Sequence, residues 1–186
     1  MFSGVIIVSI LIGKLRKGSV RALALIPFRR LYLIFLSYGL QFALMIGLVP
    51  SGSRYVPPLL HLISYILLFA ALLSNWRLPG IPLLFSGAAL NAVVIFANGG
   101  RMPVSLPHLE RAGLTNYIQL LLADGSRSHQ LISEATRLSF LGDVMVMPPP
   151  YPRPFVFSAG DVLLAIGLFL LIQWGMKLSG MADKTP

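Results

Sequence analysis

Residues 14–30 read KLRKGSVRALALIPFRR, and this stretch decides how the whole chain is expected to fold. It holds six Lys or Arg residues between two long apolar runs, and no acidic residue occurs anywhere before Glu110. Loops that carry an excess of Lys and Arg stay on the cytoplasmic side of a membrane. The stretch therefore predicts an integral membrane protein and indicates which side of the membrane it faces.

The composition of the chain supports this class. Of 186 residues, 56% are hydrophobic and 11% are charged, whereas soluble domains carry about 25% charged residues. A net charge of +9 would suggest nucleic acid binding in a soluble protein. Here the basic cluster adjoins an apolar run, so membrane insertion and anionic lipid headgroups explain it. We expect membrane lipids as partners and no nucleic acid. The absence of cysteine excludes disulfides and Cys-ligated metals.

Five apolar runs are candidate membrane spans. A span needs about 20 residues to cross a hydrocarbon core of about 30 Å. The first run is short, at about 18 Å if helical, and crosses only if flanking lysines extend to the interface; a re-entrant or interfacial segment is the alternative. The basic cluster follows this run, unlike a signal peptide, so we expect the run to stay attached. The runs are Phe2–Gly13, Leu31–Val49, Val56–Leu73, Leu78–Ala97 and Phe155–Met176.

The distribution of basic residues predicts the orientation of these spans. With five spans, residues 14–30, 74–77 and the tail from Lys177 share one side and hold nine Lys or Arg residues. The other side holds six, counted over the turn with Arg54 and the loop 98–153. The positive-inside rule places the first group in the cytoplasm. We therefore expect a multi-pass protein of the cell (inner) membrane, with its N-terminus outside and its C-terminus in the cytoplasm.

The outer loop, residues 98–153, is too long for a simple connection, because loops beyond about 15 residues are usually functional or disordered. Three short helices are predicted in it, each after a capping residue. They cover Pro107–Ala112, Thr115 to Ala123, and His129 to Leu141. The third has apolar residues at helical spacing, typical of a helix on the membrane surface. We expect a compact helical cap over the outer end of the bundle.

Four polar side chains within the spans are expected to hydrogen-bond between helices. Glycines in the second and fourth runs, Gly80 and Gly87 among them, would let helices approach closely. The four polar residues are Gln41, His61, Asn91 and Gln173.

Asp161 is the most unusual residue of the chain. It lies about six residues, or roughly 9 Å, inside the last apolar run, where a carboxylate is costly unless it is paired, hydrated or protonated. Asp143 precedes it by eighteen residues, just before the proline-rich residues 148–154. If that segment folds back, the two carboxyl groups meet at the outer interface. Two close carboxyl groups share a proton, as in hydrolases that activate water with an aspartyl pair.

The sequence around Asp161 resembles lipoprotein signal peptidase. In that family the last span opens with Phe-Asn-x-Ala-Asp, and here Phe157–Asp161 reads FSAGD. The second catalytic aspartate of that family lies about nineteen residues earlier, where this chain has Asp143. The resemblance implies an aspartyl hydrolase with Asp143 and Asp161 as catalytic residues. Ser158 and Gly160 differ from the motif, and of the family's Asn-x-x-Asp-Arg motif only Arg137 is present.

Several features over nearly the whole length resemble a family of bacterial membrane proteins of unknown function. They are the short first run, the basic loop, NGGRMPVS at 98–105, FLGDV at 140–144 and FSAGD at 157–161. This resemblance implies a bacterial inner membrane and a shared outer site, and it implies no activity.

Three roles remain open for the two aspartates. They can form structural pairs, Asp143 with Arg101 or Arg137, and Asp161 with the other or with Ser158. They can form a catalytic dyad. They can belong to a binding site for a lipid headgroup, an ion or a quinone, with Arg101 as anchor for an anion. The candidate binding residues are Asn98, Arg101, Ser105, Arg137 and Ser158.

Neither a metal site nor a cofactor site can be assigned. His108, His129 and the aspartates lack metal-ligand spacing, and phosphate-loop, catalytic-triad and dinucleotide motifs are missing. The cofactor stays unknown.

The expected fold is an all-α membrane protein: one domain, residues 1–186, with a bundle of about five transmembrane helices and the cap 98–153. The leading functional hypothesis is a non-enzymatic accessory or interaction subunit of a bacterial membrane assembly, because the chain is small and lacks a specific catalytic motif. The membrane hydrolase and the ligand-binding protein are the alternatives.

Overall fold

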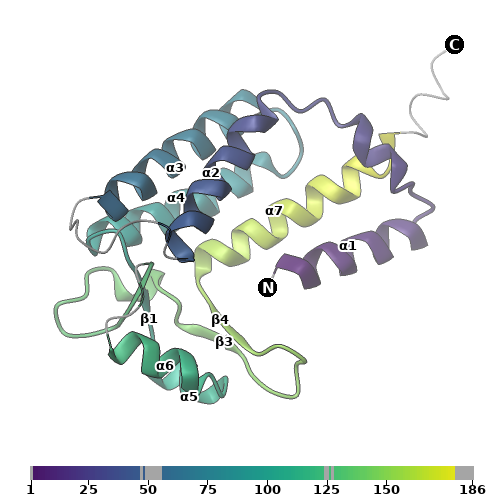
Figure 1. Cartoon of the computed structure of the whole chain (residues 1–186). Coiled ribbons are helices and arrows are strands. Elements are labelled where there is room, and N and C mark those ends of the chain that lie inside the picture. The colour runs from purple at the N-terminus through teal and green to yellow at the C-terminus, as the bar shows by residue number, and fades with distance from the viewer. Residues whose placement is uncertain (1, 47, 49–55, 124–125, 127, 179–186) are drawn as a thin grey trace, which may run out of the picture.

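The computed structural model describes residues 2–46, 48, 56–123, 126 and 128–178 (Figure 1). These residues form seven α-helices, two short 3-10 helices and four three-residue strands. The helices are α1 (Phe2–Leu15), α2 (Leu31–Met45), α3 (Val56–Ser74), α4 (Ile81–Ala97), α5 (Leu106–Arg111), α6 (Thr115–Leu122) and α7 (Ala159–Gly175). The 3-10 helices are η1 (Arg21–Leu25) and η2 (Ser139–Leu141). The strands are β1 (Met102–Val104), β2 (His129–Leu131), β3 (Met145–Met147) and β4 (Phe155–Phe157).

The five long helices coincide with the five predicted apolar runs. Within the described residues, α3 alone is both long and apolar enough to cross a bilayer. Helices α1, α2, α4 and α7 are apolar but shorter, with 14 to 17 residues. The last run does not begin as a helix, because Phe155–Phe157 pairs with Met145–Met147 as a strand. The fold is therefore mostly helical, and the all-α prediction is wrong in detail.

The long helices form a bundle with α4 and α7 in its closest contact. Helix α2 packs on α3, α3 packs on α4, and α1 lies along α7 (Figure 1). The main apolar core lies among α3, α4 and α7 and includes Tyr65, Leu72, Val94 and Leu171. Figure 1 places the residues between α4 and α7 at one end of this bundle and the C-terminal end of α7 at the other.

Two pairs of glycines set the distance between α4 and α7. Gly80, which caps the start of α4, faces Gly167 on α7, and Gly87 on α4 faces Gly160 on α7. The two glycines of each segment are seven residues apart. A Cβ atom added at Gly160 would lie 2.7 Å from the carbonyl oxygen of Gly87, and it would also overlap Asn91. Small residues allow backbones to approach in this way. Gly80 and Gly87 thus take part in the close contact expected of them, whereas Gly39 has no atom near its Cβ position.

The residues between α4 and α7 form a cap with both helices and strands. The first two predicted helices are present as α5 and α6, and they pack over a small core of Val104, Leu109 and Leu121. Strand β1 pairs in parallel with β2, and β3 pairs in antiparallel with β4.

The predicted helix from His129 to Leu141 is wrong. Its first three residues form β2, because they pair in parallel with the buried strand β1: Met102 N–H donates to Ser128, and Ile132 N–H donates to Val104. The remainder is turns and η2, and Leu138 has a φ of 52°, which interrupts any helix. The apolar spacing that favoured a helix here does not mark a buried face, because Ala135 and Leu138 are exposed.

Gly160→Ala should destabilise the fold by about 1–3 kcal/mol, because the added methyl group overpacks a contact between two backbones. Thermal unfolding in mild detergent measures the effect. The matched control is Gly39→Ala, which should be neutral or stabilise by about 0.5–1 kcal/mol through a better helix propensity. Equal melting temperatures for the two variants would contradict the close α4–α7 contact.

Candidate functional site

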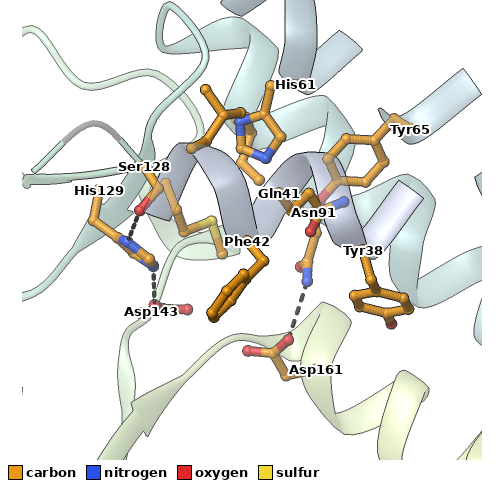
Figure 2. A pocket seen from close by; sticks show the side chains of 13 residues that line it. Tyr38, Gln41, Phe42, His61, Tyr65, Asn91, Ser128, His129, Asp143 and Asp161 are labelled. Carbon is orange, nitrogen blue, oxygen red and sulfur yellow. Dashed lines mark hydrogen bonds and ion pairs between the residues drawn. The ribbon is translucent and has the colours of Figure 1, made fainter. Parts of the chain in front are cut away.

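A pocket of about 350 Å³ lies where α2, α3 and α4 meet the cap (Figure 2). It combines aromatic walls with two carboxyl groups, two imidazoles and two amides. The lining residues are Tyr38, Gln41, Phe42, Leu44, His61, Tyr65, Asn91, Ile95, Met102, Ser128, His129, Asp143 and Asp161. The structure therefore brings together the two aspartates that the sequence singled out.

Asp161 reaches the pocket from the first turn of α7. Ser158 precedes the helix, and its hydroxyl accepts a hydrogen bond from Asp161 N–H at 3.1 Å. Asp161 Oδ2 in turn accepts from Ser158 N–H at 3.1 Å, which completes a capping box. Asp161 is thus at the helix N-terminus, where a negative charge is favoured. The expectation that it lies six residues inside a helical span is wrong, because the run starts as β4.

Asn91 on α4 ties this helix start to the bundle. Its side-chain Nδ2 donates to Asp161 Oδ1 at 3.1 Å, and its Oδ1 accepts from the Ser158 hydroxyl at 2.9 Å. Ser158 is fully buried and Asn91 is 8% exposed. Both oxygens of Asp161 are therefore acceptors in a closed network of three side chains.

Asp143 reaches the pocket from the cap. Its backbone N–H donates to Pro103, and its carbonyl accepts from Ser105, so residue 143 pairs alongside β1. Gly142 permits this approach, because a Cβ there would lie 2.5 Å from the carbonyl oxygen of Pro103. The Asp143 residue is 7% exposed, and its Oδ1 has no hydrogen-bond partner among the described residues. Figure 2 shows this side chain opposite Asp161, with the Phe42 ring between them.

His129 is the ionisable neighbour of Asp143. Its Nε2 lies 4.0 Å from Asp143 Oδ2, and its Nδ1 is hydrogen-bonded to the Ser128 hydroxyl at 2.8 Å. Burial, with the charge of Asp161, raises the pKa of Asp143 to about 7. Burial, with a smaller effect of His61, lowers the pKa of His129 to about 4. A contact at 4.0 Å is too long to offset desolvation, so the pair favours its neutral forms near pH 6.

The polar residues of the helices complete the pocket. Gln41 donates to the Ser64 hydroxyl of α3 at 3.2 Å, and His61 Nδ1 is hydrogen-bonded to the carbonyl of Gly100 at 3.1 Å. Gln173 lies far from the pocket, where it donates to Ser9 of α1 and accepts from Arg16. These side chains thus bond between segments as expected. Within the described residues, no cluster of three His, Asp, Glu or Cys residues is placed to hold a metal ion.

Comparison with known proteins places the chain in a family. A model for a family of unknown function, DUF5317, matches residues 25–173. The chain belongs to the DUF5317 family. An uncharacterised protein of Thermotoga maritima is 30% identical over 186 residues, which are 100% of this chain and 98% of that relative. No solved structure matches the chain.

The five residues predicted to bind a ligand do not line the pocket in this DUF5317 protein. Asn98 joins α4 to the cap, because its side chain donates to the carbonyl of Arg137 and accepts from Arg137 N–H. The Ser105 hydroxyl contacts His108 Nδ1 at 2.7 Å. Ser158 acts through its capping box, and Arg101 is half-buried just before β1. The neighbour of Asp143 is His129 rather than Arg137, while Asp161 does pair with Ser158.

The sequence does not place His129 or the aromatic residues beside the aspartates, although three of the polar residues that it singles out line the same pocket: Gln41, His61 and Asn91. His129 lies in a stretch that the sequence predicts as a helix, and Tyr38, Phe42 and Tyr65 stand in mostly apolar runs, where an aromatic side chain by itself marks no site. Their shared position depends on which faces of α2 and α3 turn inward.

The pH dependence of stability should separate Asp143 from His129. Because the pKa of Asp143 is raised in the folded state, the protein loses stability as pH rises from about 4 to about 7. Because the pKa of His129 is lowered in the folded state, the protein loses stability as pH falls from about 6.5 to about 4. Relative to wild type, Asp143→Asn should therefore gain melting temperature as pH rises through that window, and His129→Gln should gain as pH falls. Parallel curves for both variants would contradict these ionisation states.

Proposed function

We propose that this protein is a multi-pass bacterial membrane protein that binds a small molecule in the pocket between its bundle and its cap. The membrane part of the proposal rests on the surface of the long helices. Large apolar side chains are exposed along α1, α2 and α3, among them Leu11, Phe35 and Ile66. Water penalises such a continuous apolar surface, whereas lipid does not. Helices of 14 to 17 residues are short for a core of about 30 Å and require local thinning or extended lysines.

The placement of charge supports the proposed orientation. Eight exposed basic residues belong to the end of the bundle away from the cap: Lys14, Arg16, Lys17, Arg21, Arg29, Arg30, Arg77 and Lys177. Helix α1 starts on the cap side, because its Gly4 lies beside Tyr151 of the β3–β4 hairpin, and it ends beside Met176. This supports a cytoplasmic basic end, with the cap and the N-terminus outside.

The observation that carries the binding function is the pair of carboxyl groups in one pocket. The chain has six Asp or Glu residues, and two of them line this pocket. Burying Asp143 costs stability, since burial raises its pKa to about 7. An unfavourably buried titratable group in a concave site with convergent polar groups is typical of a binding site.

An aspartyl hydrolase is the second candidate. In its favour, Asp143 has the raised pKa of a general acid, and Asp161 accepts hydrogen bonds in the same pocket. Against it, Asp161 is already held by hydrogen bonds from Ser158 and Asn91, and the Phe42 ring lies between the two carboxyl groups in the view of Figure 2. Binding therefore fits the geometry better than a shared-proton dyad. The accessory-subunit role would require the exposed apolar helix faces to contact a partner protein, and contact with lipid explains the same faces equally well.

Cysteine labelling tests the membrane topology, and the chain offers a cysteine-free background. Ala135→Cys in the cap and Arg77→Cys between α3 and α4 both lie at exposed positions. An impermeant maleimide should label Ala135→Cys in intact cells, and Arg77→Cys only after permeabilisation. The reverse pattern would invert the orientation, and labelling of both in intact cells would contradict a membrane barrier between them.

Thermal-shift measurements in mild detergent test the binding function. A panel of small cationic, neutral and anionic organic molecules should contain ligands that raise the melting temperature of the wild type, because ligands that bind the native state stabilise it. Phe42→Ala removes a wall of the pocket and should reduce the shift. Phe35→Ala is the matched control, since Phe35 is an exposed residue of α2 outside the lining set. A panel without any stabilising compound would refute the proposal.

A further inference from the structure

The charge of the pocket is opposite to that of the protein. The chain carries 15 Lys or Arg residues against six Asp or Glu residues. Nevertheless, the described residues that line the pocket include Asp143 and Asp161 and not one Lys or Arg. A low-dielectric cleft lined by one sign of charge focuses its field on a ligand of the opposite sign. The pocket therefore attracts cations and repels anions.

The walls of the pocket suit an organic cation. Tyr38, Phe42 and Tyr65 line it, and the Phe42 ring stands between the two carboxyl groups in Figure 2. Aromatic faces attract ammonium groups through the negative charge density of the ring. A volume of about 350 Å³ far exceeds a bare metal ion and falls in the range of small organic ligands.

Asp143 has a carboxyl oxygen that is available to a ligand. Its side chain is buried, and its Oδ1 has no partner among the described residues. Buried carboxyl oxygens are nearly always hydrogen-bonded or paired with a cation. Asp161, by contrast, already accepts bonds from Ser158 and Asn91. Asp143 is therefore the group whose environment a ligand would change most.

We propose that the pocket binds a small organic ammonium ion between Asp143 and Asp161, against Phe42, in exchange for the proton of Asp143. This proposal rests on the proposed ligand-binding function and specifies its ligand class. In the exchange the O–H bond of the Asp143 carboxylic acid breaks, its proton goes to solvent, and the carboxylate remains as counter-ion to the ammonium. The reaction requires no oxidant and no covalent step.

The groups that face Asp143 are consistent with this exchange. They are His129 of β2 at 4.0 Å, Asp161 of α7 and Tyr117 of α6, and His61 of α3 lines the same pocket near His129. Burial raises the pKa of Tyr117 to about 12 and lowers that of His129 to about 4. Tyr117 and His129 are therefore both uncharged near neutral pH. The cation that replaces the proton of Asp143 is then the ligand.

Isothermal titration calorimetry of the full-length protein in detergent tests the exchange. The probes are benzyltrimethylammonium, which is a cation at every pH, benzyl alcohol and benzoate. The ammonium ion should bind more tightly than the other two. Below about pH 7 its affinity should rise about tenfold per pH unit, and buffers of different ionisation enthalpy should report release of about one proton. Above the pKa of Asp143 the slope should vanish.

Substitutions test separately the proton released by Asp143 and the aromatic contact made by Phe42. Asp143→Asn should bind the ammonium ion more weakly and without a pH slope, because it has no proton to release. Phe42→Leu keeps an apolar side chain without a π face and should weaken binding about tenfold. Phe35→Leu, on the exposed face of the same helix, should bind like the wild type. A cooperative melting transition in the absence of ligand confirms that each variant is folded.

Two results would overturn the exchange and leave the ligand-binding function intact. One is equal affinity for benzyl alcohol and the ammonium ion, and the other is ammonium binding that is independent of pH and releases no proton. If all three probes fail to bind while the wider thermal-shift panel yields a neutral or anionic ligand, the cation proposal fails alone. If that panel is also empty, the ligand-binding function fails with it.

Discussion

The close contact of α4 and α7 is the constraint on which the rest of the structure depends. Facing glycines let the two backbones meet, and the contact places Asn91 over the first turn of α7. Asn91 can then bond both members of the Ser158–Asp161 capping box. Because β4 runs directly into Ser158 and pairs with β3, the same contact also positions the cap and, through it, Asp143.

The site is built from groups that burial keeps away from their usual charge states. Asp143 and His129 face each other from the cap, and desolvation opposes charge on both. A well-packed apolar pair in these positions would cost less. A fold that keeps titratable groups in such an environment gives up stability at this site. This argues for a chemical role, although the DUF5317 family and its relative from Thermotoga maritima carry no assigned activity.

The sequence predicts the long helices well, because an uninterrupted apolar run without a charge has few other ways to satisfy its backbone. It also predicts that Asp143 and Asp161 approach each other if the segment between them folds back, and in the structure that segment does fold back as β3 and β4. The cap strands are different. Three residues are too short to show a periodic pattern, and β2 exists only because β1 lies beside it. That Phe42 forms a wall of the pocket depends on which face of α2 turns inward, and a mostly apolar run does not determine this.

The pairing of α1 with α7 has a consequence for biosynthesis. Among the described helices, the first to leave the ribosome packs along the last, and Ser9 and Arg16 meet Gln173 across more than 150 residues of chain. Until α7 emerges, the carbonyl of Ser9 lacks its amide donor and the bend after α1 lacks Met176. Non-local contacts of this kind form late and slowly. Helix α1 therefore reaches its native place only after α7 has left the ribosome.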